Sequence, residues 1–596
     1  MLNQSAGSGP ASAQGFGGQL GEMIGLLRAN RCGGRLMVLI AALVVVIGAT
    51  AWYQVQLNAW NKPFYDSLTR KDFPAFLQQL KVFGALALVL LALNVGQLWL
   101  DQTLKLTLRR GLFGALLDAW MKPGRADGIA RSGLIGENPD QRMQIDTDML
   151  ADHTAALGIG LFQSTLLLLS FIGVLWKQSG SMTLPIAGQS FNIPGFMVWC
   201  ALLYAITASW LSRLAGRRLV ELNAERSSRE AAFRFELVRV NEAREDIALH
   251  HGEAAEAARI AGTFGSVVDI ILAAIRATVG LTWVTAGYGW FAIVAPILAA
   301  SPFYFTGHMT IGELMLIVGA FNQVQSSLRW YVNNFPAIAN WRATLYRVTS
   351  FHRALAAVDG LKVADAPHIE RREQGNAIEL SGLCVMTPYL CVRLEEDPVM
   401  AAPGERVLLQ GVSGSGKTIL FRAVSGLWGL GKGRVTMPEK GRALYLPTHA
   451  YVPPGPLIDS VCYPYPPGDY AAGEVAAALE AVGLGRLAER LSSVERWDQS
   501  LNASERQCIA FARALLQKPD WLVMDDALVQ IDPEAQARIV ALLKGPLAHV
   551  GLLGVGNGAE LSALYQRSVK IISEPGIVIL PGSRHVAAAA GEAKPA

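Results

Sequence analysis

The chain has 596 residues, of which 52% are hydrophobic and only 17% are charged. It is too long for one compact domain and too apolar for an ordinary soluble protein, so we expect two domains, one of them in a bilayer. The net charge of +4 is small for this length and argues against nucleic acid as a partner. The six cysteines lack the spacing of zinc ligands, and we expect free thiols in a reducing compartment.

The first part of the chain divides into a tail and an apolar region. Residues 1–30 are rich in Gly, Ser, Ala and Gln and predict a flexible N-terminal tail. Six apolar stretches follow, each long enough to cross a hydrocarbon core of ~30 Å as a helix. They lie at 36–57, 82–100, 157–176, 195–214, 274–300 and 311–328. The sequence therefore predicts an all-α transmembrane domain with six spans over residues 31–350.

The distribution of Lys and Arg predicts how these spans are oriented. Basic residues gather before the first span, between the second and third, and after the fourth. Because positive residues near span ends are retained on the cytoplasmic side, we expect a cytoplasmic N-terminus and a cytoplasmic soluble domain. The charged stretch 221–253 is read either as a solvated helix face or as helices that extend the spans and dock on that soluble domain.

The second part of the chain alternates short apolar strands with helical runs, as an α/β domain does. We expect a linker at 351–375, this domain at 376–582 and a flexible tail at 583–596. A buried strand at 407–410 leads into G-x-x-x-x-G-K-T and then a helix. Glycine backbone amides in such a loop face phosphate oxygens, the lysine adds charge, and the threonine hydroxyl binds Mg²⁺. The predicted nucleotide-binding residues are Gly411, Ser413, Gly414, Ser415, Gly416, Lys417 and Thr418.

A second apolar strand, in WLVMDD, ends at Asp525 and Asp526. A carboxylate at this position can hold the Mg²⁺ ion of a bound nucleotide. A pair of aspartates after a strand is weak evidence alone, but LNASERQCIAFARALLQKPDW precedes this strand directly. The order of phosphate loop, this segment and the acidic strand indicates an ATPase of the ABC type.

Several motifs extend this interpretation to nearly the whole chain, apart from its two ends. FARALLQKPDWLVMDD, the phosphate loop and the GLWG after it resemble ABC transporters of the peroxisomal fatty-acyl (D) subfamily and their bacterial relatives. LNAWNKPFYDSL, NPDQR and EAAFRFELVRVNEAREDIALHHGE are similar to stretches shared with SbmA/BacA peptide permeases, which carry no ATPase domain. The resemblance implies an exporter-like membrane fold, ATP and Mg²⁺ as cofactors, and a bacterial plasma membrane location.

The resemblance also assigns roles to single residues. Asp525 matches the carboxylate that holds Mg²⁺, and Tyr389 is either an adenine-stacking aromatic or a core tyrosine. Residues 501–505 match the signature loop, which contacts ATP bound to the opposing subunit through Asn502, Ser504 and Glu505. Five positions depart from the family pattern: Thr448 replaces glutamine, Asn502 serine, Ser504 glycine, Asp526 the catalytic glutamate and Asn557 the switch histidine. We expect slow hydrolysis, with Asn502 and Ser504 crowding the signature loop.

Three functions remain open at this point. The first is an ATP-driven transporter, a homodimer in membrane lipid that imports peptides or a similar amphipathic or cofactor substrate. The second is a permease driven by the proton gradient, whose degenerate nucleotide domain binds ATP for regulation. The third is a half-transporter that pairs with an intact partner chain. Relatives handle peptides, cobalamin-like cofactors and acyl chains, and no residue decides among these substrates.

Overall fold

The computed structural model describes residues 15–29, 32–132, 139–179, 183–186, 189–192, 194–307, 309–360, 367–387, 390–439, 441–557 and 562–575. The chain divides into two compact units, which we describe separately. The membrane unit contains the described residues up to Met121 and those from Pro139 to Arg353. The nucleotide-binding unit contains the residues from Ala354 onward, together with Lys122–Ser132.

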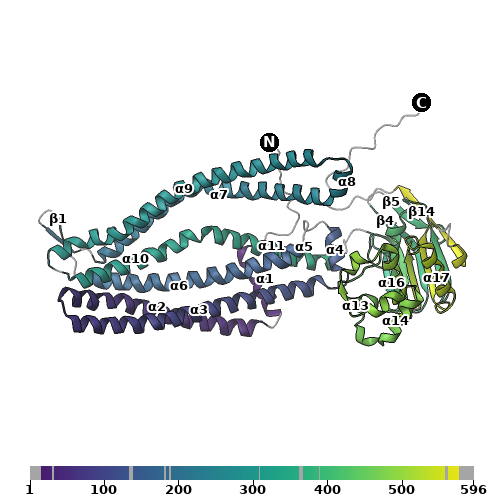
Figure 1. The fold of residues 1–596 in the computed structure, drawn as a ribbon, viewed down its shortest axis with the longest axis horizontal. Coiled ribbons are helices and arrows are strands. Elements are labelled where there is room, and N and C mark those ends of the chain that lie inside the picture. Colours follow the sequence, from purple (N-terminus) through teal and green to yellow (C-terminus); the bar gives the residue numbers. More distant parts are fainter. Residues whose placement is uncertain are drawn as a thin grey trace, which may run out of the picture. The chain divides into compact units, whose positions relative to one another are not determined.

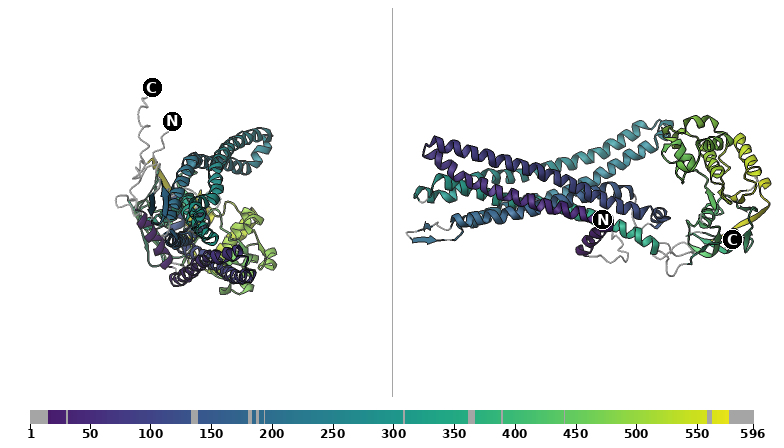
Figure 2. Two further views of the ribbon diagram at one scale, coloured as in Figure 1. Left: turned by 90° about the vertical axis from the view of Figure 1, so that its left-hand side faces the viewer. Right: turned by 90° about the horizontal axis from the view of Figure 1, so that it is seen from below.

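Long helices build the membrane unit, with one small hairpin. The helices are α1 (Phe16–Ala29), α2 (Gly33–Thr69), α3 (Phe73–Trp120), α5 (Pro139–Gln141), the π-helical turn Arg142–Asp146, α6 (Thr147–Ser179), α7 (Phe196–Glu242), α8 (Arg244–Leu249), α9 (Glu253–Phe305), α10 (Ile311–Asn333) and α11 (Phe335–Gly360). The hairpin pairs β1 (Thr183–Ile186) with β2 (Gln189–Asn192). Figures 1 and 2 show the long helices running side by side.

Five helices of the described residues are long and apolar enough to cross a membrane: α2, α3, α6 with its short lead-in, α7 and α9. The sixth predicted span, 311–328, lies in α10, which is not among them. Its second half carries five polar side chains that lower its hydropathy, namely Asn322, Gln323, Gln325, Ser326 and Ser327. The predicted helical membrane domain is confirmed, whereas the count of six spans is not.

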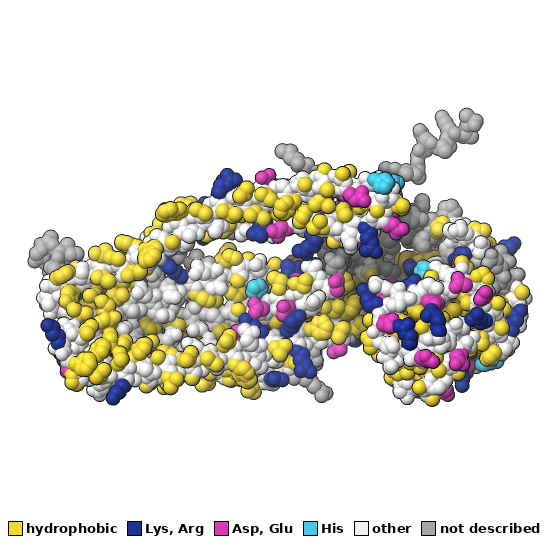
Figure 3. All heavy atoms as spheres, in the orientation of Figure 1, with side chains coloured by type: hydrophobic (Ala, Val, Ile, Leu, Met, Phe, Trp, Pro, Cys, Tyr) yellow, Lys and Arg dark blue, Asp and Glu magenta, His cyan; other side chains and the backbone are white. Residues whose placement is uncertain are grey.

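Some of these helices continue far beyond their apolar windows. α7 has 47 residues and α9 has 53, so that at 1.5 Å per residue each is much longer than the ~30 Å of a hydrocarbon core. The two helices pack along each other and are joined through α8 (Figure 1). Hydrophobic side chains cover the long helices, whereas charged side chains gather near α8 and over the nucleotide-binding unit (Figure 3). The charged stretch 221–253 is helical over most of its length, because it comprises the end of α7, the whole of α8 and the first residue of α9.

Helix α1 corrects the expected flexible tail at 1–30. Residues 16–29 form a helix whose Met23, Leu26 and Leu27 are buried. Glu22 binds His352 and Arg353 of α11, at 2.8 and 3.0 Å. The few apolar residues of this glycine-rich segment share one face at helical spacing, and their burial stabilises the helix despite the composition. Residues 1–14 and 583–596, the rest of the predicted tails, lie outside the described residues.

One mixed sheet forms the centre of the nucleotide-binding unit, in the order β3-β8-β4-β5-β14-β7-β13-β12-β9, with β6 paired to β4. Strands β14, β7, β13, β12 and β9 are parallel, and β14 joins them to the antiparallel part through β5. The strands are β3 (Glu370–Glu373), β4 (Ile378–Met386), β5 (Leu390–Leu394), β6 (Val399–Ala401), β7 (Arg406–Gln410), β8 (Gly431–Met437), β9 (Ala443–Leu446), β12 (Trp521–Asp525), β13 (Gly551–Gly556) and β14 (Arg567–Pro575).

Helices cover this sheet and enclose two apolar cores. The helices of this unit are α4 (Arg125–Ser132), α12 (Lys417–Val424), α13 (Leu457–Cys462), α14 (Ala472–Ala481), α15 (Trp497–Ser500), α16 (Ala503–Gln517) and α17 (Pro533–Lys544), with 3₁₀ turns at Pro467–Asp469, Gly485–Arg490 and Ser562–Leu564. A small ladder pairs β10 (Gly455–Pro456) with β11 (Val494–Glu495). The predicted α/β domain is confirmed.

Two expectations about this unit are corrected. The predicted linker at 351–375 is partly regular, since α11 continues to Gly360 and β3 begins at Glu370. Cys384 and Cys391, expected as free thiols, form a disulfide. They lie on the adjacent strands β4 and β5, with Cα atoms 6.1 Å apart. Cysteine spacing alone did not indicate this pair because strand pairing brings the residues together.

Candidate functional site

The carboxyl ends of four parallel strands meet at one edge of the sheet. Their register aligns Gln410 of β7 with Gly556 of β13, Asp525 of β12 with Val555, and Met524 with Leu446 of β9. In open α/β sheets, ligands bind outside the carboxyl ends of the strands. All the segments predicted to bind phosphate or sense it, apart from the signature loop, follow these four strands.

The phosphate loop, residues 411–418, turns directly from β7 into α12. Gly414 and Gly416 have φ angles of +82° and +84°, which residues with a side chain rarely adopt. A Cβ atom on Gly416 would also collide with Val392. The loop can therefore present its backbone amides only with glycine at these positions. Of its other predicted members, Ser413 is exposed and Ser415 is buried.

Two buried polar atoms at this edge have no hydrogen-bond partner among the described residues. They are Oγ of Ser415 and Oδ1 of Asp525, and both side chains are about 3% exposed. Burial, followed by the neighbouring Asp526 carboxylate, raises the pKa of Asp525, while Thr418 and Lys417 act in the opposite sense. Buried polar atoms normally have partners, so this edge suits a phosphate group and a cation. The residues present fit Mg²⁺ and ATP.

Asp526 directly follows β12 and turns toward the phosphate loop. Its φ angle is +46°, a left-handed conformation that is uncommon outside glycine. Its carboxylate lies 2.9 Å from Nζ of Lys417, and the side chains of Lys417 and Asp526 are 15% and 24% exposed. The shortened catalytic carboxylate therefore pairs with the lysine that is expected to hold phosphate.

The two other switch positions are hydrogen-bonded to the ends of neighbouring strands. Thr448 donates from Oγ1 to the backbone oxygen of Asp525, at 3.0 Å. Asn557 directly follows β13 and is exposed, and its backbone oxygen accepts from Nε2 of Gln410, at 3.2 Å. The threonine hydroxyl is thus occupied by the chain, while the Asn557 side chain remains accessible.

The signature loop begins α16. Asn502 is the N-cap and accepts from the amide of Glu505 at 2.8 Å, and Glu505 accepts in return from the amide of Asn502 at 3.0 Å. Asparagine caps helices as well as serine does, so this replacement preserves the local fold. Glu505 also binds Arg486.

Ser504 differs from our expectation. Its side chain is 6% exposed, and its Oγ accepts from the amide of Asp532 at 3.1 Å. The hydroxyl therefore points inward and ties the signature loop to the start of α17, and it does not crowd the surface of the loop. The sequence could not give this direction because it depends on where Asp532 lies in space. Tyr389, the candidate adenine contact, lies outside the described residues.

Sequence reasoning missed a group of residues around the segment that follows β9. Gln507 and Arg513 of α16 hydrogen-bond to the backbone of this segment, and His449 hydrogen-bonds to Gln530. The available signal was a polar residue and a basic residue on the otherwise apolar, buried face of the helix.

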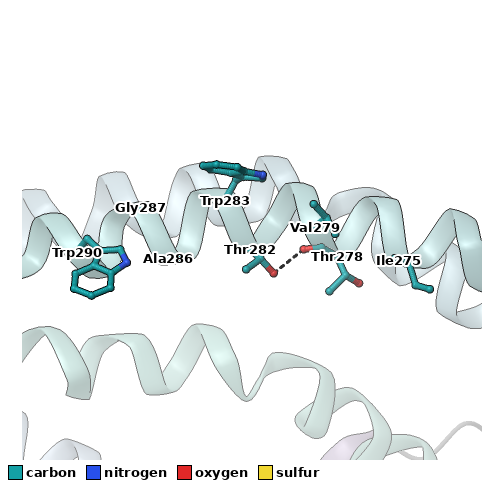
Figure 4. Close-up of a pocket in the computed structure, with 8 residues that line it drawn as sticks. All are labelled: Ile275, Thr278, Val279, Thr282, Trp283, Ala286, Gly287 and Trp290. Carbon is teal, nitrogen blue, oxygen red and sulfur yellow. Dashed lines mark hydrogen bonds between the residues drawn. The ribbon is translucent and has the colours of Figure 1, made fainter.

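The membrane unit contains a separate hollow along α9, with a volume of about 440 Å³. Trp290, Thr282 and Thr278 point to one side of the helix, and Trp283 points to the other (Figure 4). Thr282 donates to the backbone oxygen of Thr278, at 2.8 Å. The wall thus combines indole rings with small residues and hydroxyl groups inside the predicted span 274–300.

Comparison with known proteins agrees with both units. Residues 29–305 match the family model described as ABC transporter transmembrane region 2, and residues 398–529 match the model described as ABC transporter. The Escherichia coli inner membrane ABC transporter ATP-binding protein YddA is 28% identical over 87% of this chain and 91% of its own length. ABC transporter D family member 2, chloroplastic, of Arabidopsis thaliana is 26% identical over 89% of this chain and 83% of its own length.

A solved structure shares the fold. The structure of a bacterial Atm1-family ABC exporter with ATP bound aligns with a TM-score of 0.63 and 15% identity, and covers 89% of this chain and 92% of that one. The two family models together match more than half of the chain, in the order of the two units described above. The protein is therefore a membrane-spanning ABC transporter whose transmembrane region is fused to its ATP-binding domain, a relative of the D subfamily.

Proposed function

We propose that this transporter imports peptides or similar amphipathic molecules across the plasma membrane, as a homodimer that binds ATP on its cytoplasmic side. The observation that carries this proposal is the joining of long apolar helices to a phosphate loop beside two unpartnered buried polar atoms. The basic inner connections support a cytoplasmic N-terminus and nucleotide domain. The similarity to peptide permeases supports the substrate class and the direction.

The chain's own groups define how ATP is held. Amides of residues 411–416 would face the phosphates, Lys417 would add a positive charge, and Thr418 and Asp525 would hold Mg²⁺. When bound, Mg²⁺ neutralises charge that develops on the phosphate oxygens. Asp526, Thr448 and Asn557 occupy the places from which a family member orients water and senses the γ-phosphate. Because each differs from the family residue, we propose that hydrolysis by this chain alone is slow.

The ion pair between Lys417 and Asp526 favours a second candidate function. A carboxylate that occupies the phosphate-binding lysine suits a domain that binds ATP as a regulator, while the proton gradient drives transport. Pairing with an intact half-transporter would also compensate for the altered positions. The hollow along α9, with its two tryptophans within a span, supports an amphipathic substrate in each case.

The test is uptake of a fluorescent amphipathic peptide by proteoliposomes, with Mg-ATP on the side of the nucleotide domain and with or without a pH gradient. We expect uptake that requires Mg-ATP and is lost in Lys417→Ala. Uptake that follows the pH gradient and is unchanged in Lys417→Ala would establish the second function instead. Activity only when a second half-transporter is added would establish the heterodimer.

A further inference from the structure

The segment after β9, residues 447–451, is held by the signature helix α16. We name this stretch the switch segment. Gln507 is 1% exposed, and both ends of its amide are used. Its Nε2 donates to the backbone oxygen of Pro447 at 3.0 Å, and its Oε1 accepts from the backbone amide of Ala450 at 3.1 Å. These two bonds flank Thr448 and His449, so one side chain fixes the backbone on both sides of this pair.

Arg513 holds the far end of the same segment. Its Nη2 donates to the backbone oxygen of Tyr451 at 2.8 Å, and its Nε donates to that of Ser460 at 2.9 Å. Burial lowers the pKa of Arg513 to about 10, so the guanidinium stays charged at neutral pH. A buried charge is costly unless it is hydrogen-bonded, and here backbone oxygens provide the bonds. The switch segment is thus attached to α16 at three backbone groups.

The switch segment also contacts the end of β12 and the residues after it. Thr448 donates to the backbone oxygen of Asp525 at 3.0 Å, and Nδ1 of His449 lies 3.1 Å from Oε1 of Gln530. A hydrogen-bonded path therefore leads from α16 through Gln507 to the residue expected to hold Mg²⁺. The signature loop, residues 501–505, overlaps the N-terminal end of α16 and ends two residues before Gln507, so both lie on one helix.

We propose that Gln507 is a positioning residue, which makes the switch segment respond to nucleotide. It holds Thr448 and His449 against the end of β12, so that filling of the nucleotide site and movement of α16 change the same stretch of backbone. This inference rests on the proposed binding of ATP at the phosphate loop. It needs no direct contact between Gln507 and the nucleotide.

The experiment is amide hydrogen exchange of the full-length protein in lipid nanodiscs, with and without Mg-ATP. Peptides covering 410–420 report binding at the phosphate loop, and peptides covering 446–452 report the switch segment. In the unaltered protein we expect Mg-ATP to slow exchange in both. In Gln507→Leu, the phosphate loop keeps its response, whereas the response of 446–452 falls by ~5-fold or more, as expected for loss of buried hydrogen bonds.

Gln517→Leu is the matched control. Gln517 lies on the same helix and also donates to a backbone oxygen, that of Tyr463 at 3.0 Å, outside the switch segment. It should leave both responses unchanged. Gln507→Met preserves the length of the side chain, adds no charge and loses both hydrogen bonds, so it keeps the proposal testable if Gln507→Leu does not fold. We expect it to reduce the response of 446–452 as Gln507→Leu does.

The exchange results distinguish the positioning role of Gln507 from a purely structural role, and from a failure of ATP binding. A response of 446–452 in Gln507→Leu equal to that of the unaltered protein would overturn the inference, as would a phosphate loop that responds while 446–452 never does. Absence of any response in 410–420 would overturn ATP binding itself, and the inference with it. A purely structural role would lower the melting temperature of Gln507→Leu without separating the two peptides.

Discussion

The phosphate loop keeps the residues of the family pattern, whereas the residues expected to act on its nucleotide do not. From Gly411 to Thr418 the loop retains its glycines, lysine and threonine, in a conformation that requires glycine at Gly414 and Gly416. Around it, five positions differ from the family pattern, and the structure gives three of them other contacts: Thr448 with the end of β12, Ser504 with Asp532, and Asp526 with Lys417. Binding a nucleotide and hydrolysing it draw on separate residues, so a sequence can preserve the first while changing the second.

The largest effect is expected from restoring the altered positions together. We expect ATP turnover to rise by ~10²-fold or more, the cost typical of a misplaced catalytic group, in the combined variant Thr448→Gln, Asn502→Ser, Ser504→Gly, Asp526→Glu and Asn557→His. The five act on one site, so single replacements should not add up to this value. Steady-state phosphate release in lipid measures it. Turnover of about 1 s⁻¹ or faster in the unaltered protein, an ordinary enzyme rate, would contradict the premise.

Loss of the lysine charge should weaken binding itself. Lys417→Ala removes a charge-assisted contact to phosphate, and we expect the affinity for Mg-ATP to fall by ~10- to 100-fold. A fluorescent ATP analogue in equilibrium titration gives the dissociation constant. Lys432→Ala, at an exposed position on β8, is the control and should bind normally. Equal affinity in both variants would mean that the loop is not used.

The phosphate loop and Asp525 are features that the sequence alone can predict. The phosphate loop was predicted because its residues are contiguous and lie between a strand and a helix. Asp525 was predicted because an acidic residue ends an apolar strand. Both signals lie within short stretches of sequence. The parallel pairing of β7, β13 and β12 then brings the phosphate loop and Asp525 together at one edge of the sheet.

The features that were missed depend on long-range contacts. Gln507 is 60 positions from Pro447, and Ser504 is 28 from Asp532. The hydrogen bonds from Gln507 to the switch segment leave no pattern in the sequence around either partner. The same holds for the inward direction of the Ser504 side chain. The disulfide between Cys384 and Cys391 likewise follows from strand pairing. The sequence predicts a span in α10 because apolar residues dominate the first half of the helix, whereas the polar residues lie in its second half.

The pH dependence of Mg²⁺ binding should reveal the buried carboxylate. Because its pKa is raised, Asp525 contributes to the free energy of unfolding below its ordinary pKa, and this contribution is lost as pH rises through the raised pKa. Metal binding has the opposite sign, since Mg²⁺ needs the carboxylate and competes with the proton. We therefore expect the affinity for Mg²⁺ to fall by up to ~10-fold per pH unit below the raised pKa, because one proton is taken up.

The measurement is a titration of Mg²⁺ at fixed ATP over a series of acidic pH values. ATP also takes up protons, but its own titration is the same for every variant. In Asp526→Asn, loss of the neighbouring negative charge should move the midpoint of the dependence to lower pH. An unmoved midpoint would mean that the dependence comes from the nucleotide alone.

The smallest expected effect tests whether Asp526 restrains the phosphate loop. Asp526 and Lys417 form an ion pair, so ATP must displace the carboxylate before the lysine can reach phosphate. A partly exposed pair is worth about 1 kcal/mol or less, and binding is weakened by the fraction of molecules in which the pair is closed. Asp526→Asn should therefore tighten binding of ATP without Mg²⁺ by a factor of roughly 2 to 5. Asp526→Glu, which keeps the charge, should tighten it less. Equal affinity of Asp526→Asn and the unaltered protein would show that the ion pair does not compete with phosphate, and the proposal of slow hydrolysis would then depend on the other altered positions alone.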